Sequence, residues 1–92
     1  MKVQFTHDFI KIFKKRFSSK PNIHKKFDER VKKFAENPDD PILLDHALGG
    51  RLQGHRAFSI TGDVRVVYYV FEDTAYFVDI GTHNQLNKNL CG

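Results

Sequence analysis

The sequence has no tryptophan and only one cysteine among its 92 residues. Cys91 has no partner within the chain, so no internal disulfide can form, and a reducing cytoplasm is the expected location. There is no run of about 18 apolar residues, so we expect neither a membrane-spanning helix nor a membrane partner. Residues 1–20 also lack the apolar stretch and the small-residue cleavage site of a signal peptide.

Sequence motifs for cofactors and metals are equally scarce. The glycines within residues 49–54 do not open a helix, so they do not form a phosphate-binding loop. The spacings CxxC, HxH and HxxxH are all absent, which makes zinc a weak alternative. The side chains that could act as zinc ligands are His46, His55, Asp63 and His83. We therefore expect no metal and no small-molecule cofactor.

Positive charge, by contrast, is concentrated in the first third of the chain. Residues 1–33 hold eleven lysines and arginines against three acidic residues, a net charge of +8, whereas the remainder carries −4. A basic segment of this kind favours an acidic partner or a polyanion. Solvated helix faces also need lysine, and charge alone does not separate these two readings.

The periodicity of apolar residues predicts the element order β-α-α-β-β-β. Residues 1–5 alternate as in a short strand, and residues 6–17 and 21–36 carry apolar side chains at helical spacing. The short break between the two helices predicts an antiparallel helical hairpin. Residues 54–60, 64–71 and 75–80 read as strands separated by turns. The sequence thus predicts one α+β domain over residues 1–92, with the hairpin packed on a small antiparallel sheet.

Two histidines stand where loops meet the predicted sheet. His46 follows the apolar run 42–44, and His83 follows the last strand. Functional groups are often presented at such positions by a rigid scaffold. A loop histidine that only bonds to the backbone would fit the same pattern, and side-chain geometry is needed to assign acid or base chemistry.

Charged side chains also collect on the predicted hairpin around residue 62. Asp63 and Arg65 have the spacing that places two side chains on the same face of a strand, and Arg56 lies across the hairpin. The cluster is either a surface ion pair or a phosphate site in which Asp63 orients a cation or a histidine. Arg65 interrupts an apolar strand, so it must lie on a polar sheet face that the helices leave open. RNA is the substrate that such a cationic face favours.

The segments DHAL (45–48), GGRLQGHRAFSITGDVRVVYY (49–69) and VDIGTH (78–83) together resemble the RelE/ParE toxin superfamily of bacterial type II toxin–antitoxin systems, and within it the YafQ-like branch. The resemblance spans essentially the whole chain. It implies a compact sheet with two N-terminal helices on one face. It also implies a cytoplasmic toxin that is silenced by a cognate antitoxin protein.

The resemblance further implies a metal-independent endoribonuclease that cuts mRNA in the ribosomal A site. In this chemistry the ribose 2′-OH attacks the adjacent phosphate and leaves a 2′,3′-cyclic phosphate. By correspondence with the family motifs, His46, Asp63 and His83 are the expected catalytic residues, with the acid and base roles of the histidines left open. Arg56 and Arg65 are expected to hold the phosphate.

Two positions depart from the YafQ-like pattern. Ser59 stands where the family has a further histidine, and Asn87 stands where it has an aromatic residue that would stack on a base. The departures predict weak activity. They also keep two alternatives open, namely a ParE-like inhibitor of DNA gyrase and a degenerate toxin that only binds its antitoxin.

Overall fold

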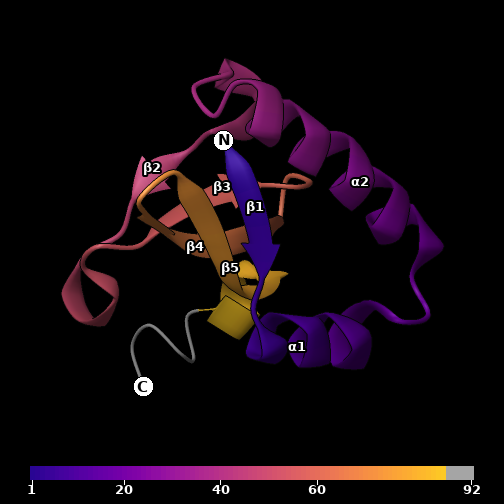
Figure 1. The fold of residues 1–92 in the computed structure, drawn as a ribbon. Helices are drawn as coiled ribbons and strands as arrows, with labels where there is room; N and C mark the ends of the chain where they lie inside the picture. The colour runs from indigo at the N-terminus through magenta and orange to yellow at the C-terminus, as the bar shows by residue number, and fades with distance from the viewer. Residues whose placement is uncertain (87–92) are drawn as a thin grey trace.

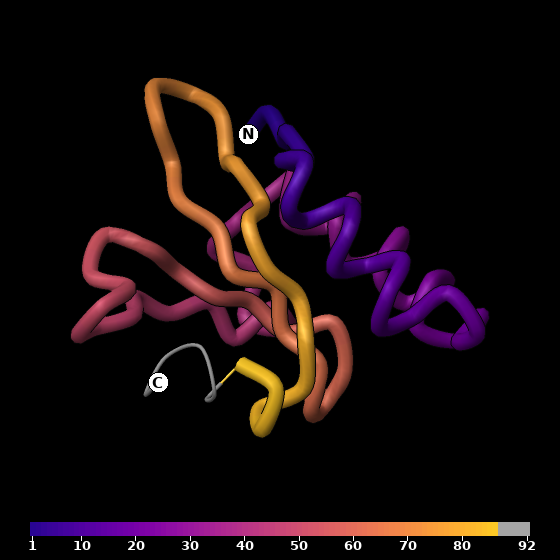
Figure 2. The backbone as a smooth tube through the Cα atoms, turned by 90° about the horizontal axis from the view of Figure 1, so that it is seen from below, coloured from indigo at the N-terminus to yellow at the C-terminus, as the bar shows by residue number. Residues whose placement is uncertain are grey.

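The computed structural model describes residues 1–86, which form a five-stranded sheet with two helices on one side (Figures 1 and 2). In chain order the elements are β1 (Lys2–Phe5), α1 (His7–Phe17), α2 (Pro21–Glu36), the short 3-10 helix η1 (Pro41–Leu43), β2 (His46–Ala47), a second 3-10 helix η2 (Gly50–Leu52), β3 (Arg56–Ser59), β4 (Val64–Phe71) and β5 (Thr74–Thr82). The α+β class and the predicted helices and main strands are confirmed.

Local signals in the sequence account for the helix boundaries. Thr6 caps α1, because its hydroxyl accepts a hydrogen bond from the Phe9 backbone N–H at 3.2 Å and donates one to the Phe77 carbonyl at 2.7 Å. Pro21 begins α2, where its missing N–H costs nothing. Within the part of the chain that the structure describes, no helix is long and apolar enough to cross a membrane.

The strand order in the sheet is β1-β5-β4-β3-β2. The meander β3–β4–β5 is antiparallel, as predicted, but β1 pairs with β5 in parallel. The sheet is therefore mixed rather than wholly antiparallel. Alternation within residues 1–5 identifies a strand, but it carries no information about a partner at the other end of the chain.

Strand β2 was absent from the sequence prediction. It contains only His46 and Ala47, which lie opposite Ala57 and Arg56 of β3. Two residues are too few to show any periodicity. Its place in the sheet matters, because pairing with β3 fixes the backbone at His46 onto the rigid meander.

The core fills the space between the helices and one face of the sheet. Phe9, Phe34, Phe58 and Phe77 are almost fully buried there. The rings of Phe34 and Phe58 stack with their centroids 4.6 Å apart. Aromatic rings bury large areas each, which explains how a chain of this size assembles a core without tryptophan.

The central strand β4 separates the two faces of the sheet. Val64, Val66 and Tyr68 belong to the core beneath the helices. Side chains alternate along a strand, so Arg65 and the other odd-numbered residues point to the opposite face, which carries no helix. In Figure 2 both helices lie on one side of the sheet, and the loop that follows β2 extends on the other. The prediction that Arg65 lies on a face left open by the helices agrees with this arrangement.

Candidate active site

A pocket of about 360 Å³ opens on the sheet face opposite α1 and α2. Its lining residues are His46, Leu48, Ala57, Arg65, Val67, His83 and Leu86. Three of the five residues singled out from the sequence therefore meet here. His46 comes from β2, Arg65 from the central strand, and His83 from the helical turn after β5, so that Arg65 lies between the two histidines in the strand order.

Arg65 supplies an uncompensated positive charge to this pocket. Its Nε atom is buried and has no hydrogen-bond partner among residues 1–86. Its cross-strand neighbours are Ser59 on β3 and Gly81 on β5, neither of which carries charge. A guanidinium held in this way keeps its donors available for an anion.

His46 is oriented by the backbone just before it. Its Nδ1 atom lies 3.0 Å from the Leu44 carbonyl oxygen. A carbonyl only accepts hydrogen bonds, so Nδ1 carries the proton and Nε2 of a neutral ring keeps its lone pair. Leu44 has the left-handed backbone conformation with φ of 51°, which turns the chain sharply between η1 and β2.

The residue before His46 is clamped to the sheet. The Asp45 carboxylate accepts a hydrogen bond from Arg56 Nε at 2.6 Å and a second one from the Tyr68 hydroxyl. Arg56 and Tyr68 are direct cross-strand neighbours on β3 and β4. Burial, together with the hydrogen bond to Asp45, raises the pKa of Tyr68 well above its usual range. The hydrogen bond to Asp45 likewise raises the pKa of Arg56.

Arg56 accordingly differs from its predicted place. It does not line the pocket, and its Nε is already engaged by Asp45. Asp45 and Tyr68 were not singled out from the sequence, because nothing in the spacing of Asp45, Arg56 and Tyr68 reveals that the folded chain brings them together. The Asp45-His46 dipeptide was the only feature of the sequence that pointed to Asp45.

His83 is held by a capping box. The Thr82 backbone N–H donates to Gln85 Oε1 at 2.8 Å, and the Gln85 N–H donates to the Thr82 hydroxyl at 3.3 Å. Residues 83–86 form a helical turn, and Leu86 at its end is buried. The spacing Thr-x-x-Gln is a recognised start signal for a helix, so the sequence contained this information although the predicted elements end at residue 80.

Two more residues fix this turn. Asp63 does not line the pocket, but its Oδ1 accepts a hydrogen bond from the His83 backbone N–H at 3.3 Å. Gly81 leaves the space that its neighbours need, since a Cβ there would lie 2.7 Å from Arg16 Nη1 and 3.0 Å from Gln85 Oε1. The structure thus brings Asp63 to the backbone of His83 rather than to its ring.

Of the two residues that depart from the family pattern, only Ser59 lies within the part of the chain that the structure describes. Ser59 lies opposite Arg65, is only 3% exposed, and its hydroxyl has no hydrogen-bond partner among the described residues. Asn87 lies outside the described residues.

Among residues 1–86 no three histidine, cysteine or acidic side chains come together as metal ligands. His55 instead makes a T-shaped contact with the Tyr69 ring, with centroids 5.5 Å apart.

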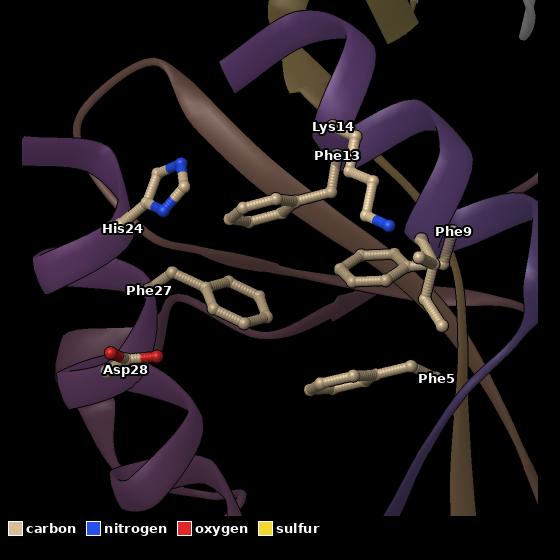
Figure 3. Close-up of a pocket in the computed structure, with 8 residues that line it drawn as sticks. Phe5, Phe9, Phe13, Lys14, His24, Phe27 and Asp28 are labelled. Carbon is tan, nitrogen blue, oxygen red and sulfur yellow. The ribbon is translucent and has the colours of Figure 1, made fainter. Parts of the chain in front are cut away.

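A second pocket, of about 210 Å³, lies on the helical side of the molecule (Figure 3). It is lined by Phe5, Phe9, Ile10, Phe13, Lys14, His24, Phe27 and Asp28. The rings of Phe13 from α1 and Phe27 from α2 approach to 4.9 Å between centroids, while Phe5 and Ile10 remain 38% and 40% exposed. Figure 3 shows the phenylalanine rings gathered around this space, with Lys14 and Asp28 near its border. Such a pocket suits an apolar side chain rather than acid–base chemistry.

Comparison with known proteins places this geometry in context. The family model of the bacterial toxin of type II toxin–antitoxin systems, YafQ, matches residues 1–88. No curated protein sequence gives a significant match.

Three solved structures that contain two toxins have the same fold. YafQ from E. coli is 19% identical with a TM-score of 0.71, over 92% of this chain and 96% of that one. A copper-bound substitution mutant of a toxin from Helicobacter pylori is 28% identical with a TM-score of 0.69, over 94% and 98%. The E. coli DinJ–YafQ toxin–antitoxin complex matches with 20% identity and a TM-score of 0.65, over 92% and 94%.

Proposed function

Since the chain belongs to the YafQ family of bacterial type II toxins, we propose that it is a ribosome-dependent, metal-independent endoribonuclease that cleaves mRNA in the A site. The observation that carries the proposal is the convergence of His46, Arg65 and His83 on one pocket of the open sheet face. Two imidazoles that flank an unpaired guanidinium are the groups that phosphoryl transfer from a ribose 2′-OH requires.

In the proposed reaction His46 acts as the general base. Its Nδ1 hydrogen bond to Leu44 supports a ring whose Nε2 accepts the proton of the 2′-OH. The 2′-oxygen then bonds to phosphorus and the bond to the 5′-oxygen breaks, which leaves a 2′,3′-cyclic phosphate. Protonated His83 gives its proton to the departing 5′-oxygen, and Arg65 stabilises the negative charge on the phosphorane.

The remaining predicted site residues act indirectly in this scheme. Asp63 positions His83 through its backbone N–H, and Arg56 positions His46 through Asp45. Ser59 lies beside Arg65 where it supplies neither acid nor base near neutral pH. We therefore propose a toxin with two imidazoles and a lower rate than a three-imidazole site would reach.

The proposal is tested by mapping message ends after incubation with translating ribosomes. The wild-type protein should cut within the A-site codon, and His83→Ala should be slower by about 10²- to 10⁴-fold, the usual contribution of a general acid. His7→Ala is the matched control, because His7 is an exposed histidine at the start of α1. Identical, uncut message with wild type and His83→Ala would refute the enzymatic proposal. A gyrase supercoiling assay run beside it would then test the ParE-like alternative.

We further propose that a cognate antitoxin covers the helical side. The DinJ–YafQ complex supports an antitoxin as partner. The pocket between α1 and α2 offers apolar walls, and Lys11, Lys14 and Lys15 lie along the adjoining surface of α1. An acidic segment with one large apolar side chain would fit both features. The salt dependence of antitoxin binding tests this, since an affinity that is unchanged between low and high salt would contradict the electrostatic part.

A further inference from the structure

A stacked pair of tyrosines lies on the sheet at a distance from the pocket. Tyr69 of β4 and Tyr76 of β5 are directly opposite in the register, and their rings are 5.2 Å apart between centroids with an angle of 17° between planes. The His55 ring meets Tyr69 edge-on at 5.5 Å. All three side chains are partly exposed.

These rings share the open face with the proposed active site. Arg65, Val67 and Tyr69 are every second residue of β4, so their side chains point to the same face. Tyr68, which lies between Val67 and Tyr69, points into the core. Tyr76 likewise lies between the core residues Ala75 and Phe77. At the usual rise of a strand, Tyr69 lies about 13 Å from Arg65. The pair therefore extends the surface of the pocket along the β4–β5 hairpin without touching the reacting groups.

We propose that Tyr69 and Tyr76 form a stacking platform for a nucleobase of single-stranded RNA, next to the nucleotide whose phosphate is held at Arg65. This inference rests on the proposed ribonuclease function and adds a substrate-binding site to it. Aromatic side chains stack on every base, because each base presents a π face. A stacked, partly exposed pair on the same face as an unpaired arginine offers a base and the phosphate of the neighbouring nucleotide separate contacts.

The charges at the two ends of β4 differ in sign. Glu72 and Asp73 form the exposed turn at the end of the β4–β5 hairpin. Their carboxylates repel phosphate, whereas Arg65 attracts it at the other end of β4. Apart from Lys2, which lies beside this turn, the charges thus favour a phosphate at the pocket over one at the turn. The platform also supplies a stacking group to a chain that has Asn87 at the family's aromatic position.

A cross-strand aromatic pair also stabilises a hairpin, so the test has to separate stacking on a base from support of the sheet. The variants Tyr69→Thr and Tyr76→Thr remove the ring and keep a residue that favours strands. Tyr69→Phe and Tyr76→Phe keep the ring and lose only the hydroxyl. Melting temperatures of all four variants report any loss of fold separately from activity.

The experiment measures single-turnover cleavage on programmed ribosomes at increasing protein concentration. The messages carry a normal or an abasic nucleotide immediately 5′ or 3′ of the cleavage position. We expect the threonine variants to raise the half-saturating concentration about 5- to 150-fold at a similar maximal rate, and the phenylalanine variants to match wild type. For wild type, an abasic nucleotide on one of the two sides should raise the half-saturating concentration by the same factor as the threonine substitutions. The threonine variants should show no further rise with the abasic message.

The inference is overturned if wild type cuts the message while the threonine variants keep its half-saturating concentration. It is also overturned if the effects of removing the tyrosine ring and of removing the base on the free energy of binding are additive, because the two groups then do not contact each other. Failure of wild type to cut any message would instead refute the proposed function.

Discussion

Asp45 links the strand that carries His46 to the middle of the sheet. Its carboxylate receives Arg56 from β3 and the Tyr68 hydroxyl from β4. Because Tyr68 is buried, loss of this acceptor leaves a polar group without a partner inside the protein. The position of a proposed catalytic histidine thus depends on a neighbour that does not itself line the pocket.

We predict that Asp45→Ala lowers the free energy of unfolding by about 1–3 kcal/mol, the usual cost of an unsatisfied buried hydroxyl. The cleavage rate should fall as well, because the loop before β2 loses its clamp. Urea denaturation measures the first effect. Asp73→Ala, at the exposed hairpin turn, is the matched control. A stability equal to that of the control would show that the Asp45 contacts are energetically unimportant.

Ser59 is the residue at which the chain departs from the family inside the described structure. Its hydroxyl is buried without a partner beside Arg65. We predict that Ser59→Ala raises the free energy of unfolding by about 1 kcal/mol, since an unsatisfied polar atom is removed. Cleavage should be unchanged. A rate reduced tenfold or more would mean that the hydroxyl takes part in the reaction.

The sequence predicted which residues line the pocket better than it predicted the contacts that each residue makes. The sequence placed His46, Arg65 and His83 at strand ends or on an open face, and these three meet in the pocket. It did not reveal that Arg56 is engaged by Asp45, because that pairing depends on strand register and side-chain direction. Asp63 was expected to orient a side chain, whereas it bonds to the backbone of His83.

At the scale of elements, apolar periodicity predicted the helices and the longer strands, but it did not predict how the strands pair. Helices α1 and α2 and strands β3 to β5 follow from apolar spacing. Strand β2 was missed because two residues show no periodicity, and the parallel partner of β1 was missed because it lies at the other end of the chain. The turn at residues 83–86 was missed for another reason, since its capping box was present in the sequence.

The capping box gives a prediction about this turn. Gln85→Ala should lower the cleavage rate by about 10- to 100-fold, because small displacements of a catalytic group are costly. The free energy of unfolding should change by only about 0.5–2 kcal/mol. Gln85→Glu should restore activity, as glutamate also completes a capping box. Gln53→Ala, on the exposed loop before β3, is the control. Full activity of Gln85→Ala would show that the cap does not position His83.

At the scale of the whole molecule, two faces carry two kinds of surface. The helical side combines a net positive charge with an apolar pocket, and the open sheet face carries the histidines, Arg65 and the tyrosine pair. The core between them couples both faces to one rigid sheet. An antitoxin bound to the helices and a message bound to the sheet would therefore occupy opposite sides.

The stability of the whole molecule should decline in alkali because of Tyr68. The pKa of Tyr68 is raised in the folded protein, so folding favours its protonated form. That contribution is fully present below about pH 10, the ordinary pKa of tyrosine, and is lost as the pH rises further. We expect the free energy of unfolding to fall by up to about 1 kcal/mol per pH unit there.

Denaturant unfolding between pH 8 and 11 tests this prediction. Tyr68→Phe should show a shallower decline than wild type, whereas Tyr76→Phe should retain the steep one because Tyr68 is intact. Equal slopes in both variants would contradict the assignment to Tyr68.

The central claim is that the pocket formed by His46, Arg65 and His83 cleaves RNA by attack of the ribose 2′-OH. Its most direct test is a message on programmed ribosomes with a single 2′-deoxynucleotide 5′ of the scissile phosphate. We predict that the all-ribose message is cut to a 2′,3′-cyclic phosphate end, and that the substituted message stays intact at that position. Equal cleavage of both messages, or of neither, would contradict the claim.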